Sequence, residues 1–353
     1  MPIRNRFGEM HAEITAWRQD IHRHPELLFD THRTSALVAE KLRGFGCDEV
    51  VTGIGGTGVV GVIRGRRTGS GRVVGLRADM DALPIEEATG ADYASQTPGV
   101  MHACGHDGHT AMLLGAARYL AETRNFDGIA VVVFQPAEEG GGGGREMCRD
   151  GLMERFGIQE VYGLHNWPGQ PLGSFAIRPG PFFASTDVFD IVFRGRGGHA
   201  AKPQETVDPV VMASHAVVAM QSIVSRNADP VEQLVISVTS VETSSRAYNV
   251  IPQEVWLKGT ARALTPELRA LAERRVPEIA EGTAALFGGT AEVQYQRNYP
   301  VMVNAPAQTE FAAAVARSVS GACAEAPLVM GGEDFAFMLQ ERPGAYILMG
   351  NGN

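Results

Sequence analysis

The 353-residue sequence contains no apolar run of the roughly 18 to 20 residues that a membrane-spanning helix requires. It also lacks a basic excess. The 31 lysines and arginines and 40 aspartates and glutamates give a formal net charge of -9, which argues against a surface that binds nucleic-acid phosphates. The opening segment, MPIRNRFGEMHAEITAW, carries charges where the apolar part of a signal peptide would lie. We therefore expect a cytoplasmic protein with neither nucleic-acid nor membrane partners.

Cysteine is scarce, and no nucleotide-binding loop is present. The four cysteines lack the dense, regular spacing of a small secreted disulfide scaffold, so we expect mostly buried free thiols. The glycine run in EEGGGGGR lacks the Gly-Lys-Ser/Thr ending of a P-loop, which excludes that type of site. Flexible packing around the two preceding glutamates is the expected role of these glycines.

The hydrophobic pattern predicts two domains, one inserted into the other. Helical periodicity and buried strands alternate in the first part of the chain and again near its end. Between them, the segments from VFDIVFRG to AEVQYQR follow a β-α-β-β-α-β order, which is typical of a ferredoxin-like α+β domain. We predict an α/β catalytic domain at residues 1–180 and 297–353, with a mixed central sheet flanked by helices, and an inserted domain at residues 181–296.

The segment MHACGHDGHT, at residues 101–110, places Cys104 and His106 in a tight loop before a predicted helix. Together, sulfur and nitrogen ligands suit Zn²⁺ or another borderline transition metal better than Mg²⁺ or Ca²⁺. A buried thiol beside helix-capping polar groups is the alternative for this pair taken alone.

Further polar residues follow three other predicted strands. Glu138 and Glu139 leave the strand of GIAVVVFQPAEEG, and His165 is predicted to end the strand EVYGLHN. Adjacent carboxylates on extended backbone point in different directions, so one can bind a metal while the other acts as a general base. Asp79 and Asp81, after RVVGLRAD, are placed to orient such ligands. Each feature alone has an ordinary structural explanation, but their shared position at strand ends favours a metal site.

Seven motifs occur in order along the chain: RADMDALP, MHACGHDGHT, QPAEEG, GLHN, GRGGHAAKP, NVIPQEVWLKGTAR and GGEDFAFML. Taken together, they resemble the aminoacylase, hippurate hydrolase and auxin-conjugate (IAA-amino acid) hydrolase branch of the dinuclear metallopeptidase (amidohydrolase) family. The resemblance extends from near His22 to the last residue, and this set of motifs is highly specific.

The resemblance implies a role for each matching residue. The implied metal ligands are Cys104, His106, Glu139 and His165, which would hold divalent cations, two per subunit, of Zn, Mn, Ni or Co. Glu138 would be the general base, and Asp81 the orienting aspartate. The inserted domain would be a lid that mediates homodimerisation, in which His199 stabilises the oxyanion, commonly in the site of the partner subunit. Asn249 and Arg262 match lid positions associated with the substrate.

One part of the family pattern is missing from this sequence. The last metal ligand of the family is a histidine that follows a stretch resembling GAYILMGNGN, and the sequence stops at Asn353. We expect that a C-terminal piece of the protein is not included, with an incomplete second metal position as the alternative.

The resulting hypothesis is hydrolysis of N-acyl amino acids, such as hippurate or N-acetyl amino acids, to a carboxylate and a free amino acid. The sequence does not specify the acyl group, the amino acid, the native metal or the pathway. Two alternatives stay open at this point: a dipeptidase or carboxypeptidase that uses the same machinery, and a non-catalytic relative that binds a metal or ligand.

Overall fold

The computed structural model describes residues 3–352, and the chain divides into two compact units. Unit 1 comprises the residues up to Gly180, Val303–Pro327 and the residues from Asp334 onward, and unit 2 comprises Pro181–Met302 and Leu328–Glu333. The strands β7 (Gly180–Phe183) and β14 (Met302–Asn304) contain two of the chain junctions.

The second junction differs from the predicted boundary between residues 296 and 297. Strand β13 continues to Tyr299, so the residues after 296 still belong to unit 2. The segment Leu328–Glu333 also returns to unit 2, where the backbone N–H of Ala184 donates to the carbonyl oxygen of Val329 at 2.9 Å. The association of this segment with unit 2 depends on backbone hydrogen bonds. Such bonds produce no periodic pattern of hydrophobic residues, so the sequence did not predict it.

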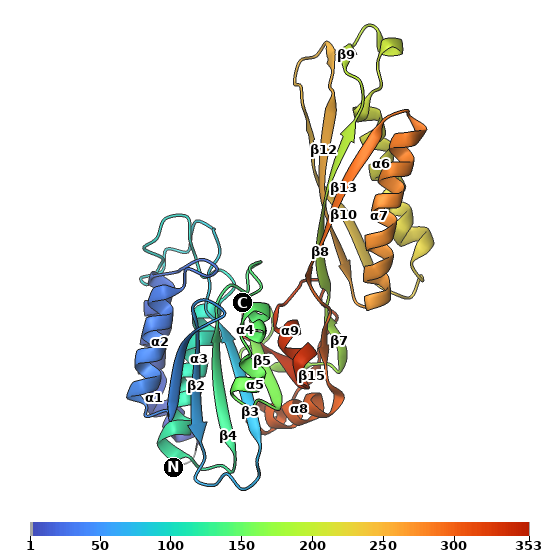
Figure 1. Cartoon of the computed structure of the whole chain (residues 1–353). Helices are drawn as coiled ribbons and strands as arrows, with labels where there is room; N and C mark the ends of the chain where they lie inside the picture. Colours follow the sequence, from blue (N-terminus) through green and yellow to red (C-terminus); the bar gives the residue numbers. More distant parts are fainter. Residues whose placement is uncertain (1–2, 353) are drawn as a thin grey trace. The chain divides into compact units, whose positions relative to one another are not determined.

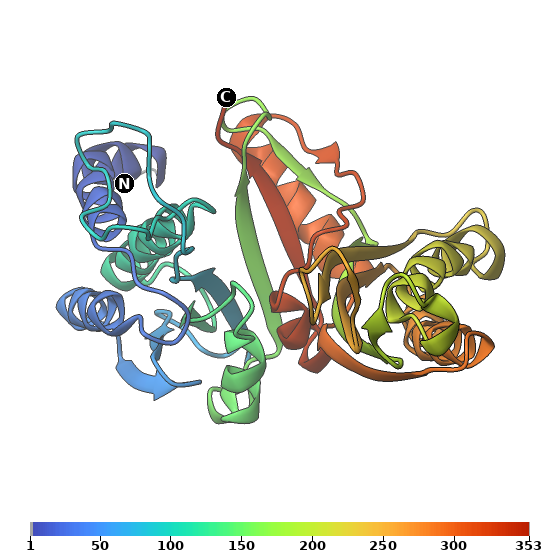
Figure 2. The same ribbon diagram turned by 90° about the horizontal axis from the view of Figure 1, so that it is seen from above.

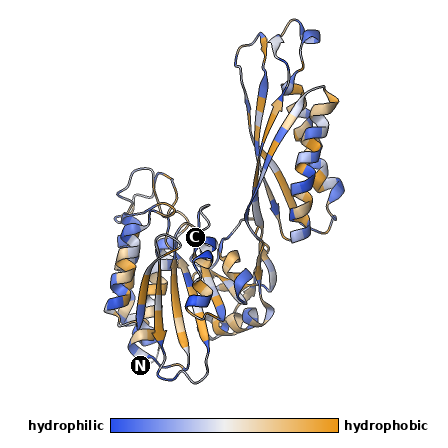
Figure 3. Cartoon of the chain, in the orientation of Figure 1, coloured by the Kyte–Doolittle hydropathy of each residue, from blue (hydrophilic) through white to orange (hydrophobic). Residues whose placement is uncertain are grey.

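Unit 1 is built on an eight-stranded mixed sheet with the order β1-β2-β4-β3-β5-β16-β6-β15. Strand β3 is parallel to β4 and β5, and β16 is parallel to β5, whereas β2 is antiparallel to both of its neighbours. The strands are β1 (Glu49–Ile54), β2 (Gly58–Arg64), β3 (Val73–Asp79), β4 (Ile129–Gln135), β5 (Glu160–Trp167), β6 (Phe175–Ile177), β15 (Ala324–Glu325) and β16 (Gly344–Gly350). The inner strands β2, β4 and β16 are almost entirely buried, and the hydrophobic residues of unit 1 are concentrated on the sheet in Figure 3.

Helices cover both faces of this sheet (Figures 1 and 2). They are α1 (Ile3–Arg23), α2 (His32–Gly44), α3 (His106–Thr123), α4 (Gly143–Arg149), α5 (Leu152–Arg155), α8 (Pro306–Ser320) and α9 (Phe335–Glu341). Trp17, Leu42 and Leu114, from α1, α2 and α3, share one core cluster with β2 and β4. On β5, Tyr162 meets Phe311 of α8, whereas a β-carbon on the next residue, Gly163, would meet Tyr346 and α9. Because successive strand residues face opposite sides, α8 and α9 lie on opposite faces.

Unit 2 has a four-stranded antiparallel sheet with the order β10-β12-β8-β13 and two long helices (Figure 1). Its main elements follow the predicted β-α-β-β-α-β order: β8 (Ser185–Arg194), α6 (Pro209–Ser222), β10 (Leu234–Thr243), β12 (Glu254–Ala263), α7 (Pro266–Leu286) and β13 (Thr290–Tyr299). The first strand thus lies beside the last, as in a ferredoxin-like fold. Two short strands that are distant in sequence, β9 (Gly198–His199) and β11 (Val250–Ile251), pair as a separate two-stranded antiparallel sheet in this unit.

Two general expectations from the sequence can be compared with the structure. Within residues 3–352, no helix is both long and apolar enough to span a bilayer. All four cysteines are free thiols, and each is partly rather than fully buried.

Candidate metal centre

Three neighbouring parallel strands of unit 1 carry some of the predicted site residues at or just after their carboxyl ends. Strand β3 ends at Asp79, β4 is followed by Glu138 and Glu139, and His165 lies near the end of β5. Parallel strands place these ends at one edge of the sheet, which is where α/β proteins bind ligands. His165 was predicted to end its strand, but β5 continues to Trp167, because it keeps its pairing with β16 through that residue.

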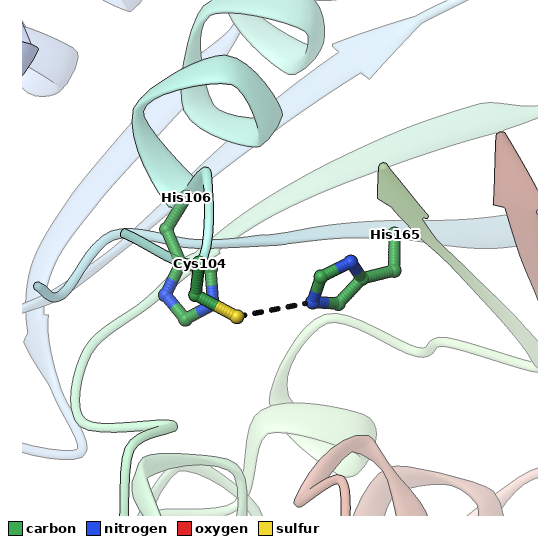
Figure 4. Close-up of side chains that lie close together, drawn as sticks. All are labelled: Cys104, His106 and His165. Atoms are coloured by element: carbon green, nitrogen blue, oxygen red, sulfur yellow. Dashed lines mark hydrogen bonds between the residues drawn. The ribbon is translucent and has the colours of Figure 1, made fainter. Parts of the chain in front are cut away.

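Cys104, His106 and His165 form a compact cluster of donors (Figure 4). Each offers one ligand atom within 4.8 Å of the others, and Sγ of Cys104 lies 3.4 Å from Nε2 of His165. Cys104 belongs to the loop before α3, and His106 is the first residue of that helix. The loop turns at Gly105, whose φ of 88° is left-handed and is favourable only for glycine.

The two glutamates after β4 join the same cluster through His106. His106, Glu138 and Glu139 also offer ligand atoms within 4.8 Å of one another, and Nε2 of His106 lies 3.9 Å from Oε1 of Glu139. Asp81 holds this loop, because its carboxylate accepts the backbone N–H groups of Glu138 at 3.0 Å and Glu139 at 3.1 Å. Asp81 is fully buried, so these bonds to a charged acceptor are well shielded from water.

The glycines after Glu139 serve close packing rather than the flexible packing expected from the sequence. Ala137, just before the glutamates, adopts a left-handed φ of 54° and is fully buried. A β-carbon on Gly141 would lie 2.7 Å from that of Ala137, and one on Gly143 would lie 1.7 Å from the carbonyl oxygen of Pro136. Side chains at these glycines would displace the backbone that presents Glu138.

The backbone hydrogen bonds of the two imidazoles use Nδ1 and leave Nε2 to the donor cluster. His106 donates from Nδ1 to the backbone oxygen of Asp81 at 2.8 Å, and His165 donates from Nδ1 to the carbonyl oxygen of Asn166 at 2.5 Å, so Nε2 carries the lone pair in the neutral form of each ring. Nε2 of His165 lies within hydrogen-bonding distance of Sγ of Cys104, 3.4 Å away. Nε2 of His106 and Oε1 of Glu139 are buried, and neither makes a hydrogen bond with any residue in 3–352. Buried polar atoms without partners are costly in a folded protein. Sulfur, nitrogen and oxygen donors so arranged fit a divalent transition metal.

Burial shifts the pKa values of the cluster residues, because it disfavours the charged form of each side chain. Burial raises the pKa of the Cys104 thiol and of the Glu139 carboxyl, and it lowers the pKa of His165 to about 3. Burial is the largest single influence on His106 and opposes its protonation, but the charge of Asp79 and the interactions with Asp81 and Cys104 together outweigh it and raise the pKa of that imidazole. A bound cation would offset the carboxylate charge and favour the thiolate.

The three residues expected to act from the lid lie in unit 2 and do not form one cluster there. His199, on β9, is exposed, and its Nδ1 accepts the backbone N–H of Ala201 at 3.1 Å. Asn249 is its neighbour, since the carbonyl oxygen of Asn249 accepts the N–H of Ala200. Arg262 is half-buried toward the opposite end of β12, where it pairs with Thr186, and burial lowers the pKa of its guanidinium.

Several buried residues around the donors were not predicted from the sequence. Arg77 and Asp334 are two of these, since Arg77 donates to the predicted Asp79 at 2.6 Å and to Asp334 at 2.9 Å, and all three side chains are almost completely buried. His109 and Asn166 form a second group behind the ligands. His109 lies one helical turn after His106, and Asn166 directly follows His165, so proximity to predicted ligands was the only available signal.

Comparison with known proteins identifies the family. Residues 75–353 match Peptidase family M20/M25/M40. This chain belongs to that family. It is 42% identical to the hippurate hydrolase of Campylobacter jejuni, over 98% of this chain and 90% of the relative. It is 40% identical to thermostable carboxypeptidase 2 of Saccharolobus solfataricus, over 99% and 89%.

A solved relative supports both the fold and metal binding. The YXEP protein of Bacillus subtilis, a dinuclear metal binding peptidase of the M20 family, has a TM-score of 0.84 to this chain and 33% identity, over 97% of this chain and 89% of that one. The resemblance found in the motifs and the expected α/β fold with a mixed central sheet are thereby confirmed. The donor cluster of this M20 protein fits divalent metal binding.

Proposed function

We propose that this protein is a metal-dependent amidohydrolase that cleaves N-acyl amino acids, such as hippurate or N-acetyl amino acids, to a carboxylate and a free amino acid. The observation that carries the proposal is the convergence of Cys104, His106, His165 and Glu139 beside a second carboxylate, Glu138, which is 7% exposed. The 42% identity to a hippurate hydrolase supports this substrate class.

The roles of the residues follow from their positions. The metal, when bound, polarises the amide carbonyl and makes a water molecule more acidic. Glu138 takes a proton from the attacking water and delivers it to the leaving nitrogen, so that the hydroxyl group ends on the acyl carbon and the hydrogen on the amine. Asp81 orients Glu138 and His106 through its three hydrogen bonds.

The lid residues complete the proposal. His199 supports the developing oxyanion, and as an exposed residue it is available to act on the site of a partner subunit. Arg262 and Asn249 are assigned to the carboxylate of the substrate, and because they lie at opposite ends of unit 2, they would have to come from different subunits to reach the same substrate. We further propose a homodimer formed through unit 2, and two ions per subunit chosen from Zn, Mn, Ni and Co. The predicted cytoplasmic location stays a prediction.

A carboxypeptidase or dipeptidase is the second candidate. It is favoured by the 40% identity to thermostable carboxypeptidase 2, which covers almost the whole chain. Both reactions use the same donors and general base, and they differ in what lies on the acyl side of the scissile bond.

A substrate panel on the metal-loaded protein distinguishes these functions. Release of free amino acid is measured from hippurate, N-acetyl amino acids and matched dipeptides, with Zn²⁺ or Mn²⁺ and after chelation. We expect a higher kcat/KM for acyl amino acids than for dipeptides, and loss of both activities after chelation. Preference for peptides would establish the second candidate. Tight metal binding with no turnover of either class would identify a non-catalytic relative.

A further inference from the structure

Both ring nitrogens of the buried His109 are used by protein partners. Its Nδ1 lies 2.6 Å from Oδ1 of Asp79. Its Nε2 lies 2.9 Å from the backbone nitrogen of Asn166 and 2.8 Å from the side-chain Nδ2 of Asn166. Because a backbone N–H can only donate, Nε2 is the acceptor and Nδ1 carries the proton donated to Asp79. His109 therefore has no free lone pair for a cation, although it is the histidine adjacent to the ligands.

Asn166 connects His109 to the loop that carries Cys104. Its side-chain amide donates to the carbonyl oxygen of Gly105 at 3.1 Å. Asn166 is also the residue that directly follows His165 in β5. A β-carbon on Gly105 would lie only 2.2 Å from Nδ2 of Asn166. The amide thus fills the space next to the loop and ties that loop to the strand bearing His165.

The ring of His109 also contacts the two imidazoles of the cluster. It stacks on His106 with a centroid distance of 5.4 Å and an interplanar angle of 28°, and it meets His165 edge-on at 4.7 Å and 74°. The ring is 3% exposed, and Asp79, which holds it, is fully buried. A rigid, buried ring against both imidazoles restricts their rotation.

We infer that Asp79, His109 and Asn166 form a positioning clamp, which sets the separation of Cys104 and His165 before a metal binds. None of the three is a ligand in this assignment, and the inference rests on the proposed metal centre. Partners of this kind, when removed, typically weaken metal binding ~10- to 100-fold. The clamp predicts the same loss here, together with a change in the geometry at the thiolate.

The test measures Co²⁺ binding rather than turnover. His109→Phe keeps a ring of similar size but removes both hydrogen bonds, and Asn166→Ala leaves His109 in place but releases Gly105. The matched control is Asn304→Ala, which removes a fully buried amide of unit 1 that donates to Arg178 and Tyr346. Affinity is measured by competition with a chromogenic chelator, the thiolate-to-cobalt absorption band by spectroscopy, and stability by urea unfolding.

We expect His109→Phe and Asn166→Ala to bind Co²⁺ ~10- to 100-fold more weakly and to shift the thiolate band. Asn304→Ala should lose stability without either change. Wild-type affinity and spectrum in the two clamp variants would overturn the inference, as would equal weakening in the control or absence of Co²⁺ binding by the wild type. If His109→Phe does not fold, Asn166→Ala decides. A wild type that binds Co²⁺ but hydrolyses no amide refutes the proposed function alone.

Discussion

Nδ1 of His106 donates a hydrogen bond of 2.8 Å to the backbone carbonyl oxygen of Asp81, and this bond determines which ring nitrogen is available to a metal. The side chain of the same aspartate holds the backbone of Glu138 and Glu139. Asp81 therefore aligns an imidazole from α3 with carboxylates from the loop after β4, two segments that are remote in sequence.

Replacement of Asp81 by alanine should weaken both stability and metal binding. The variant leaves the backbone N–H groups of Glu138 and Glu139 without their acceptor, at a cost of ~1–3 kcal/mol for each buried group. We expect a lower free energy of unfolding for the metal-free protein in urea and ~10- to 100-fold weaker Zn²⁺ binding. Unchanged Zn²⁺ affinity would show that Asp81 does not organise the donors.

Replacement of Glu138 by glutamine should separate catalysis from metal binding. Glutamine keeps the size of the side chain but cannot accept the proton of water, so kcat should fall ~100- to 10,000-fold. Bound metal, measured by elemental analysis, should stay at the wild-type level. Glu154→Gln, at an exposed carboxylate of α5, serves as the control and should keep full activity. Wild-type turnover in the Glu138 variant would remove this residue from the role of base.

Removal of the metal should abolish activity and reduce thermal stability. A metal present at 100 times its Kd stabilises the folded state by ~2.7 kcal/mol, so chelation should lower the Tm and re-addition should restore it.

Replacement of Cys104 by serine exchanges a soft sulfur for a harder oxygen, so the affinity of the variant should fall more for Zn²⁺ than for Mn²⁺. Cys323→Ser, at a free thiol of the loop after α8, should change neither affinity. An equal loss for both metals would argue against a Cys104 ligand.

Replacement of Arg262 by alanine should affect substrate binding more than the chemical step. A hydrogen bond to a charged group contributes ~1.5–3 kcal/mol, so KM for acyl amino acids should rise roughly 10- to 150-fold while kcat changes little. Arg246→Ala, at an exposed arginine of the same unit, provides the comparison. An unaltered KM would exclude Arg262 from carboxylate recognition.

Two partly buried thiols predict how stability changes at alkaline pH. Burial raises the pKa of Cys47 from 9.0 to about 11 and that of Cys148 to about 12. As the pH rises above 9, the unfolded chain loses these protons while the folded chain keeps them. The free energy of unfolding therefore falls between pH 9 and pH 11. A Cys47→Ala, Cys148→Ala double variant should show a smaller decrease in urea midpoint over this range. Identical pH profiles for the wild type and the double variant would contradict the raised pKa values of these two thiols.

The parts of the fold that were predictable are those with a strong period or a fixed chemical motif. The buried strand before Glu138 and the amphipathic helix after His106 appear as expected, because hydrophobic periodicity reports local burial directly. The strand order and the return of residues 328–333 to unit 2 depend on backbone pairing between distant segments, which leaves no periodic signal in one sequence.

The same distinction applies to the candidate site. Cys104, His106 and Glu139 carry recognisable metal-binding chemistry, so their types and spacing indicated a role. His109 and Asn166 differ, because an imidazole or an amide becomes a positioning group only through the partners of its polar atoms. Those partners come from β3, α3 and β5, and only the folded chain brings them together.

The backbone conformation and burial of Ala137 limit which amino acids fit directly before the glutamate pair. Its left-handed φ of 54° disfavours bulky and β-branched residues, and asparagine and aspartate, which tolerate that conformation, would bring a polar side chain into a fully buried position. The close approach of Gly141 excludes longer side chains as well. Only alanine and glycine remain compatible with position 137. A homologue with any other residue there would have to hold its two glutamates on a different backbone conformation.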